Sequence, residues 1–449
     1  MEKIVIIGNG IAGTTCARFL RKYSDHQIVM ISDETPYFYS RTALMYVYMG
    51  HMRFEDLKPY EDWFWEENDI ELIHDRVENL DLDNKILFCQ KGNQISYSKL
   101  ILATGSKTQT FGWSGLDLTG VFGMYHKQDL DRLEAMTNTI TRGVIVGGGL
   151  IGVELAEMLH SRGKEVTMLV RERSYFDHIL PCEESQMVTK HIQKRGIDLK
   201  LGQNLKEIVG KNGSVSSVLV SETNEEIDCQ FVGITTGVKP NIDFLKETNL
   251  EINRGIVVNS RFETSVTNVY AIGDCAEIST PSEGRKAIEP LWYTGRMMGE
   301  NLAYNLSHEP IDYSPGIWFN SAKFFDIEYQ VYGNIQPKLE DGHQTLLWID
   351  HSNEKSIRIN FNEKNEVIGF NLMGVRYRHE VCEKWVAQKT DIEEVLQNLK
   401  LANFDPEFYK TYEQEIVEIY NQKFNKSLKL KAKRNLSSVF QFLKRGNEN

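Results

Sequence analysis

One internal repeat restricts the fold of this chain more than any other feature. Residues 4–34 and 144–172 each read as an apolar strand, a glycine-rich turn, a helix, a second apolar strand and then charge. The turns are Gly8-Asn9-Gly10-Ile11-Ala12-Gly13 and Gly147-Gly148-Gly149-Leu150-Ile151-Gly152. A GxGxxG motif alone is weak evidence, but both copies lie between a strand and a helix in units of about 30 residues. Two domains built on a parallel sheet are therefore predicted.

Each glycine of this motif has a physical purpose. The first permits a tight turn, the second lets the backbone approach a pyrophosphate, and the third lets the helix pack on the strand. The free N–H groups and partial positive charge of the helix N-terminus attract the phosphates. We therefore predict one dinucleotide at Gly8, Gly10 and Gly13, and another at Gly147, Gly149 and Gly152. Gly163 lies where the second helix is expected to stop, a position that favours φ > 0.

The residues after the second strand differ between the two copies. The first copy has Asp33-Glu34, and an acid there can accept hydrogen bonds from ribose hydroxyls. The second copy has Arg171 and Arg173 with Glu172 between them. Arginine suits a 2′-phosphate, so this copy favours NADPH, while Glu172 leaves NADH open. An ordinary solvated strand end is the alternative for Arg171.

The chain of 449 residues is too long for one core. From about residue 315 the pattern changes to alternating strands, such as 356–361 and 367–373, followed by helices, which predicts an α+β domain. The predicted fold is α/β, with two Rossmann-like domains and this C-terminal domain. The predicted segments are 1–112 with 240–312, 113–239, 313–422, and a basic tail at 423–449.

Composition excludes several classes of protein. A formal charge of −12 argues against nucleic acid as the main partner. The N-terminus enters an apolar strand at once, without a cleavable signal, and the longest apolar run is too short to span a membrane. The six cysteines form no CxxC pair, and no metal site is predicted. We therefore expect a reduced, cytoplasmic protein.

Four motifs in order carry a resemblance to a known family. The first GxGxxG, Ala103-Thr104-Gly105, the second GxGxxG and Ala271-Ile272-Gly273-Asp274 resemble the FAD-dependent pyridine nucleotide-disulphide oxidoreductase superfamily over about residues 3–305. The resemblance implies FAD at the first glycine loop and NAD(P)H at the second. It also implies an α/β fold and hydride transfer from the nicotinamide to the flavin.

The resemblance assigns roles to single residues. Glu34 is expected at the adenosine ribose of FAD, and Arg41, in Tyr39-Ser40-Arg41, at another FAD contact. Glu154 is expected near the nicotinamide ribose and the flavin, as the catalytic candidate, although an ordinary acid on a helix face is the alternative. The other expected cofactor contacts are Val77, Thr104, Gly105, Asp274, Trp292 (first in a helix that points at the flavin) and Gly237.

Departures from the family narrow the function. There is no cysteine between Cys16 and Cys89, and Thr42 stands where the single-cysteine branch has its thiol. Tyr46 stands where ferredoxin reductases of the superfamily often have a lysine. The C-terminal part weakly resembles that of ferredoxin, rubredoxin and nitrite reductases. We therefore predict an NAD(P)H:acceptor oxidoreductase that reduces a ferredoxin-like protein or a quinone. The alternatives are a disulfide reductase or NADH oxidase, and a redox-sensing flavoprotein that is not an enzyme.

The end of the chain is basic. Residues 423–445 contain eight Lys or Arg and no acid, and Leu436, Val439, Phe440 and Leu443 share a face if the segment is helical. A solvated tail, or one docked on its own acidic body, is one interpretation. A contact with an anionic membrane or an acidic carrier protein is the other. The sequence leaves the oligomeric state open, a homodimer included.

Overall fold

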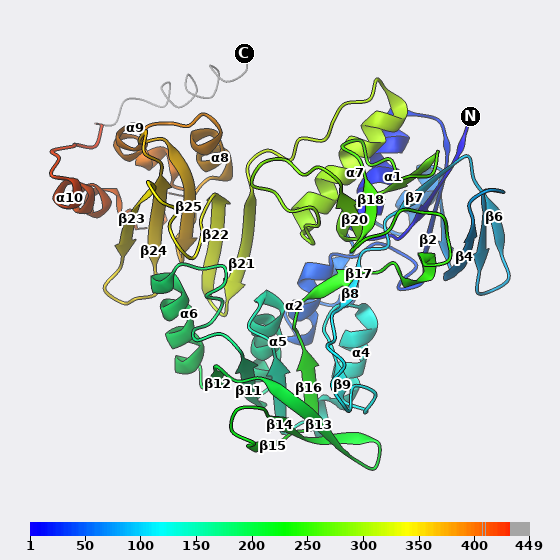
Figure 1. Ribbon diagram of the computed structural model, residues 1–449, viewed down its shortest axis with the longest axis horizontal. Coiled ribbons are helices and arrows are strands. Elements are labelled where there is room, and N and C mark those ends of the chain that lie inside the picture. The colour runs from blue at the N-terminus through cyan, green and yellow to red at the C-terminus, as the bar shows by residue number, and fades with distance from the viewer. Residues whose placement is uncertain (406, 409, 432–449) are drawn as a thin grey trace. The chain divides into compact units, whose positions relative to one another are not determined.

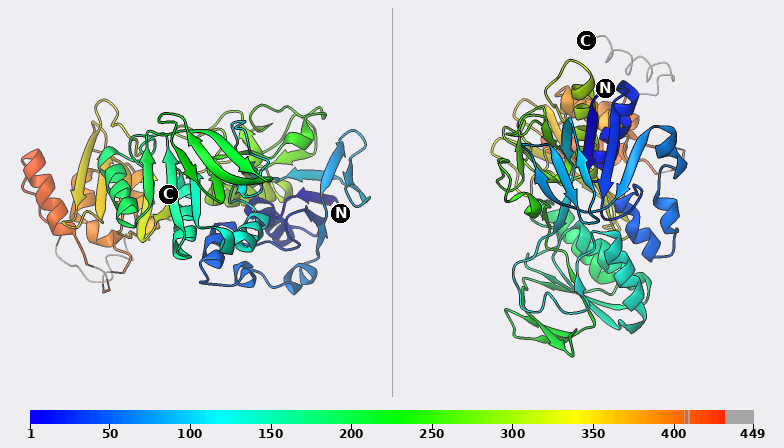
Figure 2. Two further views of the ribbon diagram at one scale, coloured as in Figure 1. Left: turned by 90° about the horizontal axis from the view of Figure 1, so that it is seen from below. Right: turned by 90° about the vertical axis from the view of Figure 1, so that its right-hand side faces the viewer.

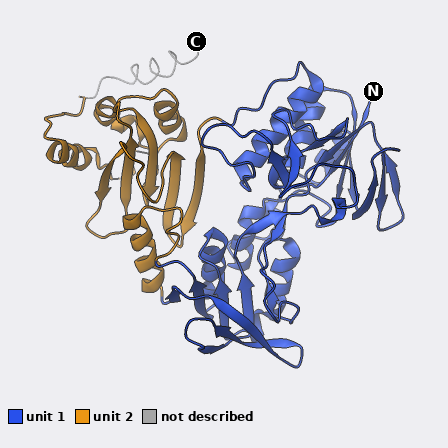
Figure 3. Cartoon of the chain, viewed as in Figure 1, with its two compact units in different colours: residues 1–173, 196–315 blue, residues 174–195, 316–449 orange. Residues whose placement is uncertain are grey.

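The computed structural model describes residues 1–405, 407–408 and 410–431 (Figure 1). The chain forms two compact units (Figure 3). Unit 1 contains residues 1–173 and 196–315, and unit 2 contains residues 174–195 and the chain from residue 316 onward.

The first glycine repeat builds a five-stranded parallel sheet in unit 1. In spatial order its strands are β19 (Val269–Ala271), β7 (Lys99–Leu102), β1 (Lys3–Ile7), β2 (Gln27–Ser32) and β3 (Ile70–His74). Their apolar runs are buried, as expected for a parallel sheet covered on both faces. The helices α1 (Ile11–Tyr23) and α7 (Trp292–Ser307) pack side by side (Figure 1). A β-carbon at Gly299 would lie 2.4 Å from the Ala12 carbonyl oxygen, so this close helix contact requires glycine.

The second repeat builds a second parallel sheet in unit 1. Its strands are β12 (Asp198–Leu201), β11 (Glu165–Val170), β10 (Arg142–Val146), β16 (Phe231–Ile234) and β9 (Val121–Phe122). The helix α5 (Leu150–Ser161) covers one face, and three antiparallel strands cover the other (Figure 2). These are β13 (Leu205–Lys211), β14 (Ser214–Val220) and β15 (Glu226–Asp228). Gly163 has φ of +69° just after α5, as predicted.

Shorter elements complete unit 1. Three small sheets accompany the two large ones: the three-stranded sheet β4-β5-β6 and the two-stranded pairs β17-β8 and β18-β20. Their bounds are β4 (Val77–Asp81), β5 (Ile86–Cys89), β6 (Gln94–Ser96), β8 (Ser106–Thr108), β17 (Val238–Pro240), β18 (Ile256–Val258) and β20 (Ala276–Ile278). The helical segments are η1 (Arg41–Ala43), α2 (Leu44–Tyr48), η2 (Phe54–Leu57), α3 (Trp63–Glu67), α4 (Lys127–Met136), η3 (Thr137–Thr139), η4 (Asp243–Leu245) and η5 (Gly273–Cys275).

Unit 2 is an antiparallel sheet with helices. The strand order is β21 (Phe319–Phe324), β22 (Ile327–Gly333), β25 (Val367–Met373), β24 (Ser356–Phe361) and β23 (Gln344–Ile349). Four helical segments pack around a core on one face of this sheet. They are α8 (His379–Ala387), α9 (Ile392–Gln397), η6 (Leu399–Ala402) and α10 (Glu413–Phe424). Alternate residues of β24 turn Ile357 and Ile359 to this core and Arg358 to the opposite face.

The helix α6 (Cys182–Lys194) also belongs to unit 2. The buried Arg358 of β24 holds Glu184 of α6 through Nε and Nη2, at 2.7 and 2.8 Å from the two carboxylate oxygens. In sequence α6 lies between β11 and β12, inside the range 113–239 predicted for the NAD(P)H-binding domain. A helix that follows a Rossmann strand in sequence thus packs within the C-terminal unit.

The fold predicted from the repeat is confirmed as α/β. Both glycine turns join a strand to a helix at the predicted residues, and the elements from β21 to α10 form the α+β part. Of the predicted basic tail, residues 432–449 lie outside the described residues. In its first part Lys426 pairs with Glu393 at 2.7 Å, and Leu428 and Leu430 pack on the core of unit 2. Among the described residues, no helix is both long and apolar enough to cross a membrane.

Candidate active site

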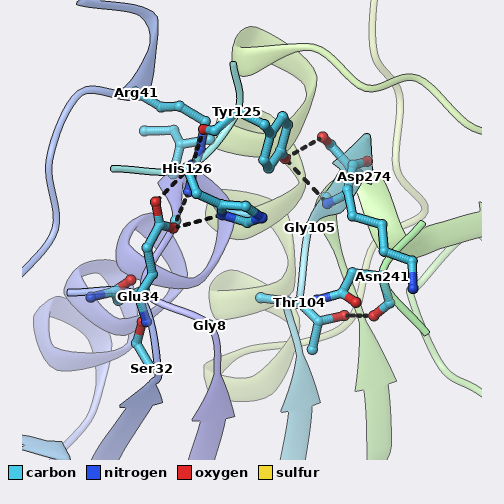
Figure 4. A pocket seen from close by; sticks show the side chains of 18 of the residues that line it. Gly8, Ser32, Glu34, Arg41, Thr104, Gly105, Tyr125, His126, Asn241 and Asp274 are labelled. Carbon is cyan, nitrogen blue, oxygen red and sulfur yellow. Dashed lines mark hydrogen bonds and ion pairs between the residues drawn. The ribbon is translucent and has the colours of Figure 1, made fainter. Parts of the chain in front are cut away.

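A cavity of about 500 Å³ opens in unit 1 at the carboxyl ends of β1, β2 and β7 (Figure 4). The central strand β1 lies between β2, which follows it in sequence, and β7, which comes later. Ligands of open parallel sheets bind where the strand order reverses in this way. The volume is within the range of small-molecule and cofactor sites.

The first glycine loop forms one wall of this cavity, and its three glycines meet different constraints. Gly8 has φ of +109°, and a β-carbon there would lie 2.1 Å from the Ala103 carbonyl oxygen. A β-carbon at Gly13 would lie 2.1 Å from the Gly8 carbonyl oxygen. At Gly10, which lines the cavity, a β-carbon would meet no atom within 4 Å. Gly8 and Gly13 therefore serve the fold, whereas Gly10 leaves space beside the N-terminus of α1, which fits a pyrophosphate.

Glu34 lies just after β2, and several protein groups donate hydrogen bonds to its carboxylate. Arg41 donates to both carboxylate oxygens, from Nη1 at 2.9 Å and from Nη2 at 2.5 Å, and the Tyr39 hydroxyl makes a further short contact. The backbone amide of Lys127, at the start of α4, donates to Glu34 at 2.9 Å, and His126 Nδ1 is 3.5 Å away (Figure 4). Burial raises the pKa of Glu34, but hydrogen bonds and charge from His126 and Arg41 outweigh it and hold the pKa well below the usual value. Glu34 is thus a fixed anion that joins β2 to α4.

Tyr125 and Asp274 lie next to each other at the edge of the cavity (Figure 4). The Tyr125 hydroxyl accepts from the Ser106 amide at 3.2 Å and donates to Asp274 at 3.4 Å. Loss of hydration raises the pKa of the Asp274 carboxyl and of the Tyr125 hydroxyl. The Asp274 carboxyl borders the cavity but is poorly hydrated, so it needs a hydrogen-bond donor. A hydroxyl group of a ligand in the cavity could donate to it.

The helix that follows the second glycine loop reaches the same cavity. Ile151, Glu154, Leu155 and Met158 of α5 are among the lining residues. Pro290, Leu291 and Trp292 line it as well, where α7 begins. Side chains from both repeats and the N-terminus of α7 therefore border one space.

The second glycine loop repeats the geometry of the first. Gly147 has φ of +123°, and a β-carbon there would lie 2.5 Å from the Thr235 carbonyl oxygen. At Gly149 the nearest atom would be 4.0 Å away. Glu172, after β11, places Oε2 3.4 Å from the β-carbon position of Gly148. The Arg171 side chain is 73% exposed and donates from Nε to Glu172 at 2.7 Å. The acid, rather than Arg171, is therefore beside the glycine loop.

No thiol reaches the cavity. All six cysteines lie among the described residues and are free, and none is a lining residue. Thr42 does line it. Burial raises the pKa of Cys16, Cys275 and Cys382, which makes these thiols poor nucleophiles.

The structure brings together many of the residues that the sequence singled out. The predicted residues that line the cavity are Gly8, Gly10, Glu34, Arg41, Val77, Thr104, Gly105, Glu154, Asp274 and Trp292. The others lie elsewhere: Gly13 inside α1, and Gly147, Gly149, Gly152, Arg171, Arg173 and Gly237 outside the cavity lining. Sequence reasoning missed Tyr125, His126 and Asn241, which also line it. No local pattern marks these three, because only the fold places their loops beside the first sheet.

Comparison with known proteins finds a family that this chain matches. Residues 2–299 match the family described as pyridine nucleotide-disulphide oxidoreductase. An NADH oxidase of Methanocaldococcus jannaschii is 30% identical over 427 residues, which cover 90% of this chain and 94% of the relative. A rubredoxin-NAD(+) reductase of Ectopseudomonas oleovorans is 30% identical over 284 residues, covering 63% of this chain and 74% of the relative. These names specify NAD, so the preference for NADPH predicted from Arg171 and Arg173 finds no support in them.

Solved structures show the same fold at lower identity. A NAD-dependent persulfide reductase from A. fulgidus superposes with a TM-score of 0.82 at 22% identity, covering 94% of this chain and 83% of that one. A ferredoxin reductase from Rhodopseudomonas palustris gives 0.76 at 23% identity, covering 83% and 91%. Because the family match spans residues 2–299, the chain belongs to the pyridine nucleotide-disulphide oxidoreductase family, and it is an oxidoreductase that uses FAD and a pyridine nucleotide.

Proposed function

We propose that this chain is an NADH-dependent flavoprotein reductase that passes electrons to a small iron–sulfur protein without a protein thiol. The observation that carries the proposal is the composition of the cavity wall. It combines the first glycine loop with Glu154 of α5, which follows the second loop, and it contains no cysteine.

The proposal assigns FAD to this cavity. Residues 1–112 and 240–312 would form its binding domain, and residues 113–239 the NADH-binding domain, apart from residues 174–195, which belong to unit 2. The loop at Gly10 and the N-terminus of α1 would hold the pyrophosphate, and Asp274 would accept a hydroxyl of the ribityl chain. Val77, Thr104 and Gly105 would contribute further contacts. When bound, FAD accepts a hydride and releases electrons one at a time.

The chain's own residues would position the coenzyme. Glu154 would orient the nicotinamide ribose at the cavity wall, so that the hydride donor and the flavin meet in a fixed geometry. The N-terminus of α7 would place its partial positive charge towards the flavin. Apolar side chains such as Leu155 and Met158 would exclude water from the same wall.

Glu172 supports NADH as the coenzyme. Its carboxylate is beside the second glycine loop and would accept hydrogen bonds from the ribose hydroxyls, whereas a 2′-phosphate would be repelled. Replacing Glu172 by Gln removes the repulsion but keeps the side-chain length. We expect kcat/KM to rise for NADPH and to fall for NADH, while Arg173→Gln leaves the NADH value unchanged. A wild-type enzyme that prefers NADPH would contradict this assignment.

Two observations support an iron–sulfur acceptor. No thiol in the cavity can relay an electron pair, so electrons would leave from the flavin itself. Relatives that match the chain include rubredoxin-NAD(+) reductases. The test is to reduce the purified protein with NADH in the absence of oxygen. Reoxidation by rubredoxin, ferredoxin, quinone, a disulfide and oxygen is then followed at the flavin absorbance. The proposal requires that one iron–sulfur carrier reoxidises the flavin faster than all other acceptors.

An NADH oxidase is the second candidate, because a relative that matches 90% of this chain carries that name. In that case oxygen would accept the two electrons of each NADH. The balance is NADH, a proton and O₂ giving NAD⁺ and H₂O₂, since no second redox centre of the cavity wall could supply two more electrons. This candidate is favoured if oxygen reoxidises the flavin faster than every carrier protein does and one H₂O₂ forms per NADH.

A further inference from the structure

A buried ion pair lies just before α7 in unit 1. Arg285 and Glu289 are four residues apart, and each side chain is 7% exposed. Arg285 donates to both carboxylate oxygens of Glu289, from Nε at 2.8 Å and from Nη2 at 2.5 Å. Burial raises the pKa of Glu289, but the hydrogen bonds and charge of Arg285 reverse this shift and hold the pKa below its usual value. Glu289 is therefore ionised at neutral pH and forms an ion pair with the Arg285 guanidinium.

The ion pair is joined directly to the first turn of α7. The hydroxyl of the buried Thr294, the third residue of this helix, donates to Glu289 Oε2 at 3.2 Å. The Leu291 amide donates to the Glu289 carbonyl at 2.8 Å. Pro290, Leu291 and Trp292, which follow Glu289 directly, line the cofactor cavity. The two charges thus lie immediately behind the wall from which the helix N-terminus faces the cavity.

The sign of the charge at this place matters for the cofactor. A helix N-terminus carries about +0.5 of an elementary charge, which favours an anion in front of it. Glu289 alone would cancel that positive charge, because a buried charge is only weakly screened by solvent. Arg285 neutralises Glu289 and so preserves the positive end of α7. If the pair only held the start of α7 in place, its hydrogen bonds would be enough, and the equal and opposite charges would not be needed.

We propose that Arg285 and Glu289 are positioning residues that set the midpoint potential of the bound flavin, by cancelling each other's charge at the N-terminus of α7. This inference rests on the proposed function, which assigns FAD to the cavity. Reduction adds negative charge to the flavin, so a net negative charge behind the wall lowers the potential and a net positive charge raises it. The two members of the pair must then act with opposite signs.

The experiment measures the midpoint potential of the full-length holoprotein by dye-coupled reductive titration. Arg285→Met leaves Glu289 without its partner, and at a pH above the burial-raised pKa of this carboxyl the net negative charge is expected to lower the potential. Glu289→Gln leaves a net positive charge and is expected to raise it. Each shift corresponds to about a tenfold change in the ratio of affinities for reduced and oxidised FAD, or about 30 mV for a two-electron couple. The double variant is expected to return to within about a twofold change of that ratio, or about 9 mV, of the wild type.

Control variants separate this effect from loss of structure. Arg285→Lys keeps the charge but loses the paired hydrogen bonds, so its potential stays near that of the wild type. Arg53→Met removes a positive charge whose side chain is 80% exposed, and it must not shift the potential. If Arg285→Met alone fails to bind FAD, the double variant is compared with Glu289→Gln. The potential of the double variant must then be lower than that of Glu289→Gln.

The outcomes are distinct. Shifts of the same sign in both single variants, or no shift in either, overturn the inference and leave the pair a mechanical element. A failure of the FAD assignment on which the inference rests is visible beforehand, because the wild-type protein would then contain no FAD. A failure of the proposed acceptor is visible separately, in the reoxidation experiment, and leaves the potentials measurable.

Discussion

The sharpest prediction concerns two glycines of one motif. Substituting one by Ala should weaken FAD binding, and substituting the other should destabilise the fold. Gly10 has φ of −69° and ψ of −176°, which any residue can adopt, and an added β-carbon there touches nothing. Gly10→Ala should therefore fold normally, with a change in stability below about 1 kcal/mol. The methyl group would occupy space needed by the pyrophosphate and weaken at least one hydrogen bond to it. Such a bond to a charged group contributes about 1.5–3 kcal/mol, so FAD affinity should fall by roughly 10- to 150-fold.

Gly13→Ala should behave in the opposite way. Its β-carbon would lie 2.1 Å from the Gly8 carbonyl oxygen, so the backbone of β1 or α1 must move. Such overpacking costs about 1–3 kcal/mol, and the apoprotein itself should be less stable. Gly149→Ala is the matched control in the second motif, where the nearest atom is 4.0 Å away. It should keep its FAD and its stability and raise only the KM for NADH.

The assay combines two measurements on each variant. Urea unfolding of the apoprotein reports stability, and titration with FAD, followed by flavin fluorescence, reports affinity. The reasoning is refuted if Gly10→Ala binds FAD as tightly as the wild type, or if it destabilises the apoprotein as much as Gly13→Ala does. Loss of FAD from Gly149→Ala would show that the two glycine loops do not serve separate ligands.

Two further predictions follow from the cavity wall. Replacement of all six cysteines by Ser or Ala should leave the rate of flavin reduction by NADH within about twofold of the wild type; a thiolate–flavin charge-transfer band in the reduced wild-type protein would contradict this. Glu34→Gln should lower the free energy of unfolding at pH 7 by about 2 kcal/mol, because Arg41 and the Lys127 amide lose a charged acceptor. The pKa of Glu34 is depressed in the folded state, so its stabilisation is fully present above the unfolded carboxyl pKa of about 4.3 and is lost as the pH falls through the folded value. Urea midpoints of wild type and variant should accordingly differ at pH 7 and converge in acid, and a difference that persists unchanged at pH 3 would count against the charge.

The sequence by itself determined the architecture of unit 1. The backbone has φ above zero at Gly8 and Gly147, and the helix lies close to the strand at Gly13. Glycine suits each of these positions, so the motif predicts the conformation of the turn. The buried apolar runs around it are typical of parallel strands. Most of the predicted cofactor residues therefore line one cavity, since the carboxyl ends of neighbouring parallel strands share an edge.

Only the tertiary structure decided which side chains oppose each other. Tyr125 and His126 precede α4, far in sequence from the first glycine loop, and enter the cavity because α4 begins at the Glu34 carboxylate. Whether Arg171 or Glu172 is beside the second loop depends on the direction in which each side chain points after β11 has ended. The placement of α6 depends on a buried partner, Arg358, more than 170 residues away. Local patterns record the propensity and periodicity of one segment, whereas these contacts arise from long-range packing, and no local pattern contains that information.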